Sequence, residues 1–226
     1  MKKTIFAIAL ITFTSLAFAQ QVRQTNQMFG DNATFSGIKS STGRVLTYDD
    51  ISGTPYPNKN FATAKIGTTD QRILVRYNSY NDEVEFKKDD QILSLLKTPE
   101  YSRVEIISPK QTLVLLETND DLSGYFFEIT SGKNSLYKKI KTKFIDAVPA
   151  ANSYSTDKPA FFKTSDPVYY IKTENNFIKK PKNQKEIIEA FPSLKDQINT
   201  YFKSNKVKFN NEEDLIKLVN HLNQQS

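Results

Sequence analysis

The feature that most constrains the fold is a change in hydrophobic periodicity near residue 180. From about Thr34 to Lys180 the apolar residues recur mostly with a period of two, or in short runs of β-branched and aromatic residues. Beyond Lys180 they recur at the spacing of one helix face. A period of two is typical of strands with one buried face, and the helical spacing is typical of helices that pack through one stripe. The sequence therefore predicts a sheet followed by helices.

The predicted sheet is antiparallel, because its candidate strands are separated by turn-forming clusters and no helical pattern lies between them. In residues 82–87, Val84 and Phe86 share one face, which predicts a half-buried strand. The other face carries Glu83, Glu85 and Lys87. The run 113–116 is apolar on both faces, so we place it centrally in the sheet, where a helix would cover it. The candidate strands are residues 72–77, 82–87, 91–96, 103–107, 112–117, 125–130, 136–145 and 168–173.

Three helix starts are predicted after residue 180. Each has an Asn or Ser side chain three residues ahead of an acid, an arrangement that satisfies free N–H groups at a helix start. The pairs are Asn183 with Glu186, Ser193 with Asp196, and Asn210 with Glu213. Two apolar stripes follow, one made of Leu194, Ile198, Tyr201 and Phe202, the other of Leu215, Leu218, Val219 and Leu222. Short amphipathic helices do not stand alone, so we expect them to pack together and on the sheet.

The first nineteen residues have the three parts of a secretory signal peptide. A basic start, Met1-Lys2-Lys3, precedes an apolar stretch over 5–16 and the small-x-small motif of residues 17–19. We expect cleavage between Ala19 and Gln20, and therefore export to the periplasm or out of the cell. The apolar stretch is shorter than the ~20 residues that cross a bilayer, so no transmembrane span is expected after processing.

These features define an α+β fold class. We expect an N-terminal signal peptide, then an antiparallel β-sheet meander, either open or closed into a half-barrel, and then a C-terminal subdomain of three short helices. The expected divisions are a signal peptide over residues 1–19, an antiparallel β domain over 20–180 and a helical subdomain over 181–226. The chain has no Cys, so in an oxidising compartment it must be held together by side-chain contacts alone.

The composition excludes several kinds of chemistry. With one His and no Cys in 226 residues, the chain has no thiol nucleophile, no cysteine-based metal site and no site that needs two histidines. We therefore expect no metal and no cofactor. The formal net charge of +6 is small and dispersed, so no nucleic-acid partner is expected. The single histidine, His221, is expected at the surface near the end of the last helix, where a cation suits the helix dipole.

Paired carboxylates are the remaining option for catalysis. Glu83 and Glu85 project from one predicted strand face, with Cβ atoms ~7 Å apart, and such a pair suits a glycoside hydrolase. A solvated strand face gives the same spacing, and nothing in the sequence indicates burial or a shifted pKa. We therefore expect no enzyme and assign no catalytic residue, with a carboxylate-dependent hydrolase acting on envelope glycans as the alternative.

Two groups of residues are candidate binding surfaces. Arg76, Tyr77 and Tyr80 surround one predicted hairpin, and Arg and Tyr are favoured anchors at interfaces. The same residues suit a structural hairpin whose Asn and Asp side chains cap the turn, and we favour that interpretation. The second group, Lys139, Lys141 and Lys143, lines one face of the predicted strand 136–145. These lysines predict either a surface for anionic lipid or glycan, or a strand edge protected from pairing, and we favour the edge.

The chain contains the strings Gly53-Thr54-Pro55-Tyr56, Arg76-Tyr77-Asn78, Asp82-Glu83-Val84-Glu85, Phe202-Lys203-Ser204-Asn205-Lys206 and Glu212-Glu213-Asp214-Leu215. In these strings it resembles a group of uncharacterised exported proteins of Bacteroidota-type cell envelopes. That group has no assigned activity, so the resemblance implies a location in the cell envelope and a fold, but no mechanism. Taken together, we expect an exported, non-enzymatic binding or scaffold module for an envelope protein partner or an apolar ligand.

Overall fold

The structure is a computed structural model that describes residues 29–33, 37–41, 43–67, 72–150, 152, 154, 156–174 and 176–225. The predicted signal peptide and its cleavage point between Ala19 and Gln20 lie outside the described residues. No helix in the described part of the chain has both the length and the apolar character needed to cross a membrane.

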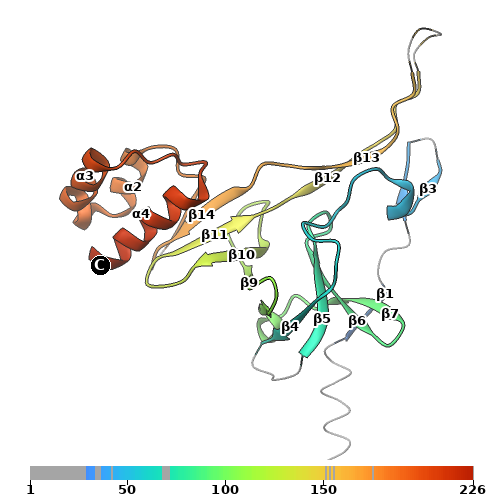
Figure 1. The fold of residues 1–226 in the computed structure, drawn as a ribbon, viewed down its shortest axis with the longest axis horizontal. Helices are drawn as coiled ribbons and strands as arrows, with labels where there is room; N and C mark the ends of the chain where they lie inside the picture. The colour runs from blue at the N-terminus through green and yellow to red at the C-terminus, as the bar shows by residue number, and fades with distance from the viewer. Residues whose placement is uncertain are drawn as a thin grey trace, which may run out of the picture.

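The main sheet has eleven strands in the order β1-β7-β6-β5-β4-β8-β9-β10-β11-β14-β15 (Figure 1). All neighbouring strands are antiparallel, and the two end strands do not pair with each other, so this sheet is open. The predicted antiparallel sheet is thus confirmed in its open form. Its strands are β1 (Phe29–Ala33), β4 (Ala62–Ile66), β5 (Arg72–Asn78), β6 (Glu83–Lys88), β7 (Gln91–Leu95), β8 (Arg103–Ile106), β9 (Gln111–Leu116), β10 (Gly124–Thr130), β11 (Ser135–Lys139), β14 (Val168–Lys172) and β15 (Phe177–Lys179).

The sheet curves until distant strands share one core. Tyr77 on β5 meets Phe127 on β10 edge to face, with ring centroids 5.6 Å apart. Val84 and Phe86 face the same core from β6, as their alternation predicts. The members of this first core are Ala64, Ile66, Val75, Tyr77, Val84, Phe86, Leu95, Tyr101, Val104, Ile106, Leu113, Tyr125 and Phe127.

The run 113–116 lies in β9, between β8 and β10, so its central place in the sheet is confirmed. The expectation that a helix covers this run is wrong. Leu113 faces the first core and Val114 faces a small cluster with Phe126 and Tyr170, so residues of the sheet itself cover both faces.

A two-stranded hairpin leaves the main sheet and projects from the molecule (Figure 1). It consists of β12 (Thr142–Ile145) and β13 (Phe161–Thr164), which pair with each other and continue β11 and β14 outward. We call the described residues of 141–165, namely 141–150, 152, 154 and 156–165, the arm. Another small pair, β2 (Ile38–Lys39) and β3 (Val45–Leu46), packs against it through a cluster that includes Phe162.

The predicted strand 136–145 is therefore two strands, and the single long strand is wrong. Ile140 and Lys141 separate β11 from β12. At this point the Thr142 N–H donates to the carbonyl of Ser79, in the β5–β6 turn, and the chain departs from the sheet. The break comes from a distant turn, which the local pattern of residues 136–145 does not encode.

The C-terminal helices are α2 (Gln184–Ala190), α3 (Lys195–Ser204) and α4 (Glu212–Gln225), so the predicted count and order are confirmed. They pack at the end of β11 and β14 that lies opposite the arm (Figure 1). Their apolar stripes meet Leu136, Tyr169 and Ile171 of the sheet in one continuous core. The expected boundary at residue 180 falls between β15 and α2.

The helix starts differ in detail from the prediction. Asn183 caps α2, since its side chain accepts from the Glu186 N–H. The cap of α4 is Asn211 rather than Asn210, because Asn211 accepts from the Asp214 N–H at 2.9 Å. The predicted Ser193 cap is wrong. A short 3-10 turn over Pro192–Leu194 precedes α3, whose N-cap is Leu194 and has no side-chain cap bond.

Candidate functional site

A cleft of about 300 Å³ opens between the segment 57–60 and the curved sheet. Residues of β4 and β5 form one side, and residues of β10 and the end of β11 form the other, so the curvature of the sheet creates the space. Its lining residues are Pro57, Asn58, Asn60, Ala62, Val75, Arg76, Tyr77, Ile106, Pro109, Gln111, Phe127, Lys138 and Ile140.

The cleft has an apolar wall and two cationic side chains. Val75, Ile106 and Phe127 are buried members of the first core that also reach the cleft. Lys138 pairs with Glu212 of α4 at 2.7 Å, and its ammonium lies 5.8 Å from the centre of the Phe127 ring. The second cation, Arg76, pairs with Glu85 at 2.7 Å. Each cation therefore already has a carboxylate partner.

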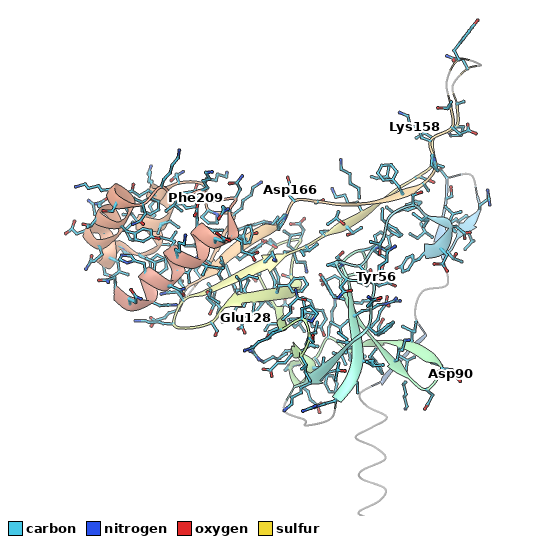
Figure 2. The ribbon with its side chains drawn as sticks, viewed as in Figure 1. Tyr56, Asp90, Glu128, Lys158, Asp166 and Phe209 are labelled. Carbon is cyan, nitrogen blue, oxygen red and sulfur yellow. The ribbon has the colours of Figure 1, made fainter. Side chains whose placement is uncertain are left out.

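A buried polar cluster holds Arg76 at the side of the cleft. Its guanidinium lies 3.8 Å from the centre of the Tyr56 ring. Tyr56 lies beside the end of β5 (Figure 2). Arg76 Nε donates to Glu85 Oε2 at 2.7 Å, and Arg76 Nη2 donates to the Tyr56 hydroxyl at 2.7 Å. The Tyr56 hydroxyl in turn donates to Glu85. Burial, and then the nearby Glu85 carboxylate, raise the pKa of Tyr56, so this hydroxyl stays protonated.

The solvated face predicted for β6 is wrong at Glu85, which is only 2 % exposed. Besides Arg76 and Tyr56, it accepts from the Asn78 side chain at 2.8 Å. Glu83 is half-buried and accepts from the Ser94 hydroxyl at 3.0 Å. Neither acid lines the cleft, so the structure does not bring this pair together in a site open to a substrate.

The hairpin candidates Arg76, Tyr77 and Tyr80 divide between two environments. Arg76 and Tyr77 line the cleft, whereas Tyr80 packs against Phe162 of the arm, with ring centroids 5.4 Å apart. The turn itself agrees with the structural interpretation, in which an Asn side chain caps the hairpin. The Asn78 side chain accepts from the N–H groups of Tyr80 and Asn81 at 3.1 and 3.2 Å, and so closes the turn.

The three candidate lysines do not share an exposed face. Lys139 is 3 % exposed and contacts Asp82 Oδ1 at 2.6 Å, while Lys141 and Lys143 are exposed. Burial lowers the pKa of Lys139, and Asp82 opposes that shift. The predicted row of exposed lysines fails at Lys139, the last residue of β11. The side chain of Lys139 is buried because it pairs with a carboxylate in the turn before β6.

The sequence did not single out several residues of the site. Tyr56 and the segment 57–60 precede β4, and their Pro and Asn residues indicate only a turn. Lys138 is one of several lysines near the end of β11 and nothing in the sequence distinguishes it. Of the lining residues, the sequence singled out only Arg76 and Tyr77, which lie in an aromatic and charged string.

His221 and the acidic side chains of the described residues do not line the cleft. His221 stacks on Tyr201, with ring centroids 4.5 Å apart, and is half-buried rather than a free surface residue. Within the part of the chain that the structure describes, no three His, Asp or Glu side chains gather in a way that could hold a metal ion.

No family model, no curated protein and no solved structure matches this chain. The resemblance to exported proteins of Bacteroidota-type envelopes therefore stays a prediction.

Proposed function

We propose that this protein is an exported, non-enzymatic binding module of the cell envelope, and that its cleft takes an apolar group from a small ligand or from an envelope protein. One observation carries the proposal: a cleft of about 300 Å³ remains open beside the first core. Small-molecule sites start at about this volume and have mainly apolar walls.

The charges at the cleft favour a neutral group over an anion. Arg76 is neutralised by Glu85 and Lys138 by Glu212, so an incoming anion would compete with two existing ion pairs. An aromatic ring or a short acyl segment meets no such competition, and it gains free energy by leaving water against the wall of Ala62, Ile106 and Ile140.

The proposal that the module is not an enzyme rests on the state of its acids. Glu85 accepts from the side chains of Tyr56, Arg76 and Asn78 and is 2 % exposed, so its carboxylate is already engaged within the protein. Glu83 lies on the same strand but outside the cleft. The hydrolase alternative therefore gains no support from the geometry.

The binding test uses a neutral fluorescent probe, N-phenyl-1-naphthylamine, with the protein as the cell produces it. We expect the probe to bind the wild type, and Ala62→Phe, which fills the cleft, to bind at least about 10-fold more weakly. The matched control is Leu74→Phe, since Leu74 is 43 % exposed on the same strand and does not line the cleft. Equal probe affinity in all three proteins, or no binding to the wild type, would overturn the proposal.

A rim substitution protects this test against loss of folding. Gln111 is exposed at the mouth of the cleft, so Gln111→Trp adds volume there without entering the core. The chain has no other Trp, and the new indole therefore reports on the cleft alone. We expect its emission to shift when the probe binds. An unchanged emission at saturating probe would place the probe elsewhere and contradict the proposal.

Export is tested separately by mass spectrometry of the N-terminus. We expect the chain recovered from the envelope or the medium to begin at Gln20. Recovery of the intact chain from the cytoplasm would contradict the address but not the cleft.

A further inference from the structure

The arm has two faces of opposite character, set by its register. Thr142 pairs with Thr164 and Phe144 with Phe162, and the two Phe side chains belong to the cluster that joins the arm to β2 and β3. The pairs that alternate with them point the other way. They are Lys143 with Lys163 and Ile145 with Phe161, and exposed Lys141 extends the row by two residues. We call Lys141, Lys143, Ile145, Phe161 and Lys163 the outer face.

The outer face carries an uncompensated like-charge pair. Lys143 and Lys163 lie directly opposite each other, an arrangement that destabilises a two-stranded ladder. Among the described residues, none of the three lysines of the outer face forms an ion pair. The nearby acid Asp146 is already used, since it accepts from the Ser40 hydroxyl at 2.8 Å and from the Ser41 N–H at 2.6 Å. An external anion would relieve the repulsion.

Apolar side chains lie beyond these lysines, further along the arm. Phe161 is 38 % exposed, Val148 is 55 % exposed and Tyr154, toward the far end of the arm, is fully exposed. Aromatic residues that combine an apolar ring with a polar group are favoured at the interface between a bilayer and water. Lysines with long apolar stems suit the same depth, because the ammonium reaches the headgroups while the stem stays among apolar groups.

The shape of the arm selects a broad surface over a small ligand. It projects from the body, with Asp166 near its base and Lys158 close to its far end (Figure 2). A projecting hairpin can reach a flat surface before the described body of the protein that carries it does. We propose that the outer face of the arm binds the anionic surface of a phospholipid bilayer, with Tyr154 and Phe161 at the level of the headgroups. This goes beyond the proposed cleft and does not depend on it.

Vesicle co-sedimentation tests the proposal, with the protein as the cell produces it. We expect binding to vesicles of phosphatidylcholine with 30 % phosphatidylglycerol, weaker binding at high salt, and none to phosphatidylcholine alone. The triple variant K141Q/K143Q/K163Q should bind the anionic vesicles at least about 10-fold more weakly. The control K195Q/K203Q/K206Q removes three exposed lysines from the helical region and should bind within about 3-fold of the wild type.

Each other outcome counts against the proposal. Equal loss of binding in the two triple variants would show a response to net charge alone. Binding of the wild type to dextran sulfate but not to anionic vesicles would assign the lysines to a polysaccharide instead. Circular dichroism of every variant checks that the fold is retained.

A single Trp in the arm gives an independent readout. The emission of Tyr154→Trp should shift to the blue with anionic vesicles, whereas Gln224→Trp, exposed on α4, should not change. An unchanged Tyr154→Trp emission on bound protein would overturn the assigned orientation, and with it the proposal.

Discussion

Asp82 and Lys139, separated by 57 residues in the chain, form an ion pair at 2.6 Å between Oδ1 and Nζ. Asp82 ends the β5–β6 turn with a positive φ of 58°, and Lys139 ends β11. The same carboxylate accepts from the N–H of Tyr125 and from the Tyr77 hydroxyl, at 3.2 and 2.7 Å. This contact joins two distant parts of the open sheet, and it holds the walls of the cleft in their relative positions.

The first prediction concerns this ion pair. Lys139→Met should lower the free energy of unfolding by about 3 kcal/mol, because it leaves the Asp82 carboxylate without its buried counter-ion. The matched control is Lys97→Met, since Lys97 contacts the same carboxylate at 2.9 Å but is 40 % exposed. Its loss should cost less than about 1 kcal/mol. Urea unfolding followed by circular dichroism measures the free energy of unfolding of both variants. An equal loss in the two would contradict a special stabilising role for the Asp82–Lys139 ion pair.

The second prediction assigns Glu85 a structural role. Glu85→Ala should destabilise the protein by about 3–5 kcal/mol, because it leaves Arg76 and the hydroxyl of Tyr56 buried without their acceptor. Glu83→Ala should cost about 1 kcal/mol, since Glu83 is half-buried and loses one hydrogen bond from Ser94. Thermal unfolding of the two variants makes the comparison. A stable Glu85→Ala protein would reopen the case for a free, chemically active carboxylate.

The third prediction is a pH dependence that arises at Asp120. Burial by itself would raise the pKa of this carboxyl, but hydrogen bonds from the Leu122 N–H, the Tyr170 hydroxyl and Lys179 lower it to about 2. A folded-state pKa below the unfolded value of ~3.9 gives stability that is present above about pH 4 and lost as the pH falls toward 2. About 2 kcal/mol should be lost across that window.

Asp120→Asn tests this dependence. Its free energy of unfolding should vary less between pH 4 and 2.5 than that of the wild type, by urea titration at each pH. Asp121→Asn is the control, because the Asp121 side chain is 81 % exposed. If the free energy of unfolding falls equally steeply with pH in the Asp120 variant and the wild type, the pH dependence does not arise at Asp120.

The fourth prediction separates two helix starts that look alike in sequence. Asn183→Ala should cost about 1 kcal/mol, because its side chain caps α2 by accepting from the Glu186 N–H at 3.1 Å. Ser193→Ala should change stability by less than about 0.5 kcal/mol, since α3 has no side-chain cap bond. Chemical unfolding of the two single variants measures the difference, and the reverse order would show that Ser193 is the true cap in solution.

The parts of the fold that follow from local pattern were predictable. The alternation of Val84 and Phe86 and the stripe of Leu215, Leu218 and Leu222 each repeat with the period of their own element, and all these residues are buried. The turn between β6 and β7 follows from its Asp residues, where Asp89 takes a positive φ of 53°. Strands with a weak pattern were missed, such as β4, β13 and β15.

The candidate site was predictable only at Arg76 and Tyr77. Its walls come from β4, β5, β10 and β11, and no local pattern says that these strands will face one another across a curved sheet. Polar residues posed the harder problem. An alternating Glu or Lys indicates a solvated face, yet Glu85 and Lys139 are both buried, because distant partners neutralise them there.

The sequence by itself determined the class of the fold, the faces of its stronger strands and the stripes of its helices, since these depend on periods of two and 3.6 residues within one element. Tertiary structure decided the curvature of the sheet and the break in the strand after Lys139. It also decided that Lys143 lies beside Lys163, and not in a row with Lys139, on the exposed face. The physical reason is that each of these depends on contacts between residues far apart in the chain. The Asp82 carboxylate determines where the side chain of Lys139 lies, 57 residues later, and the sequence around Lys139 does not indicate this contact.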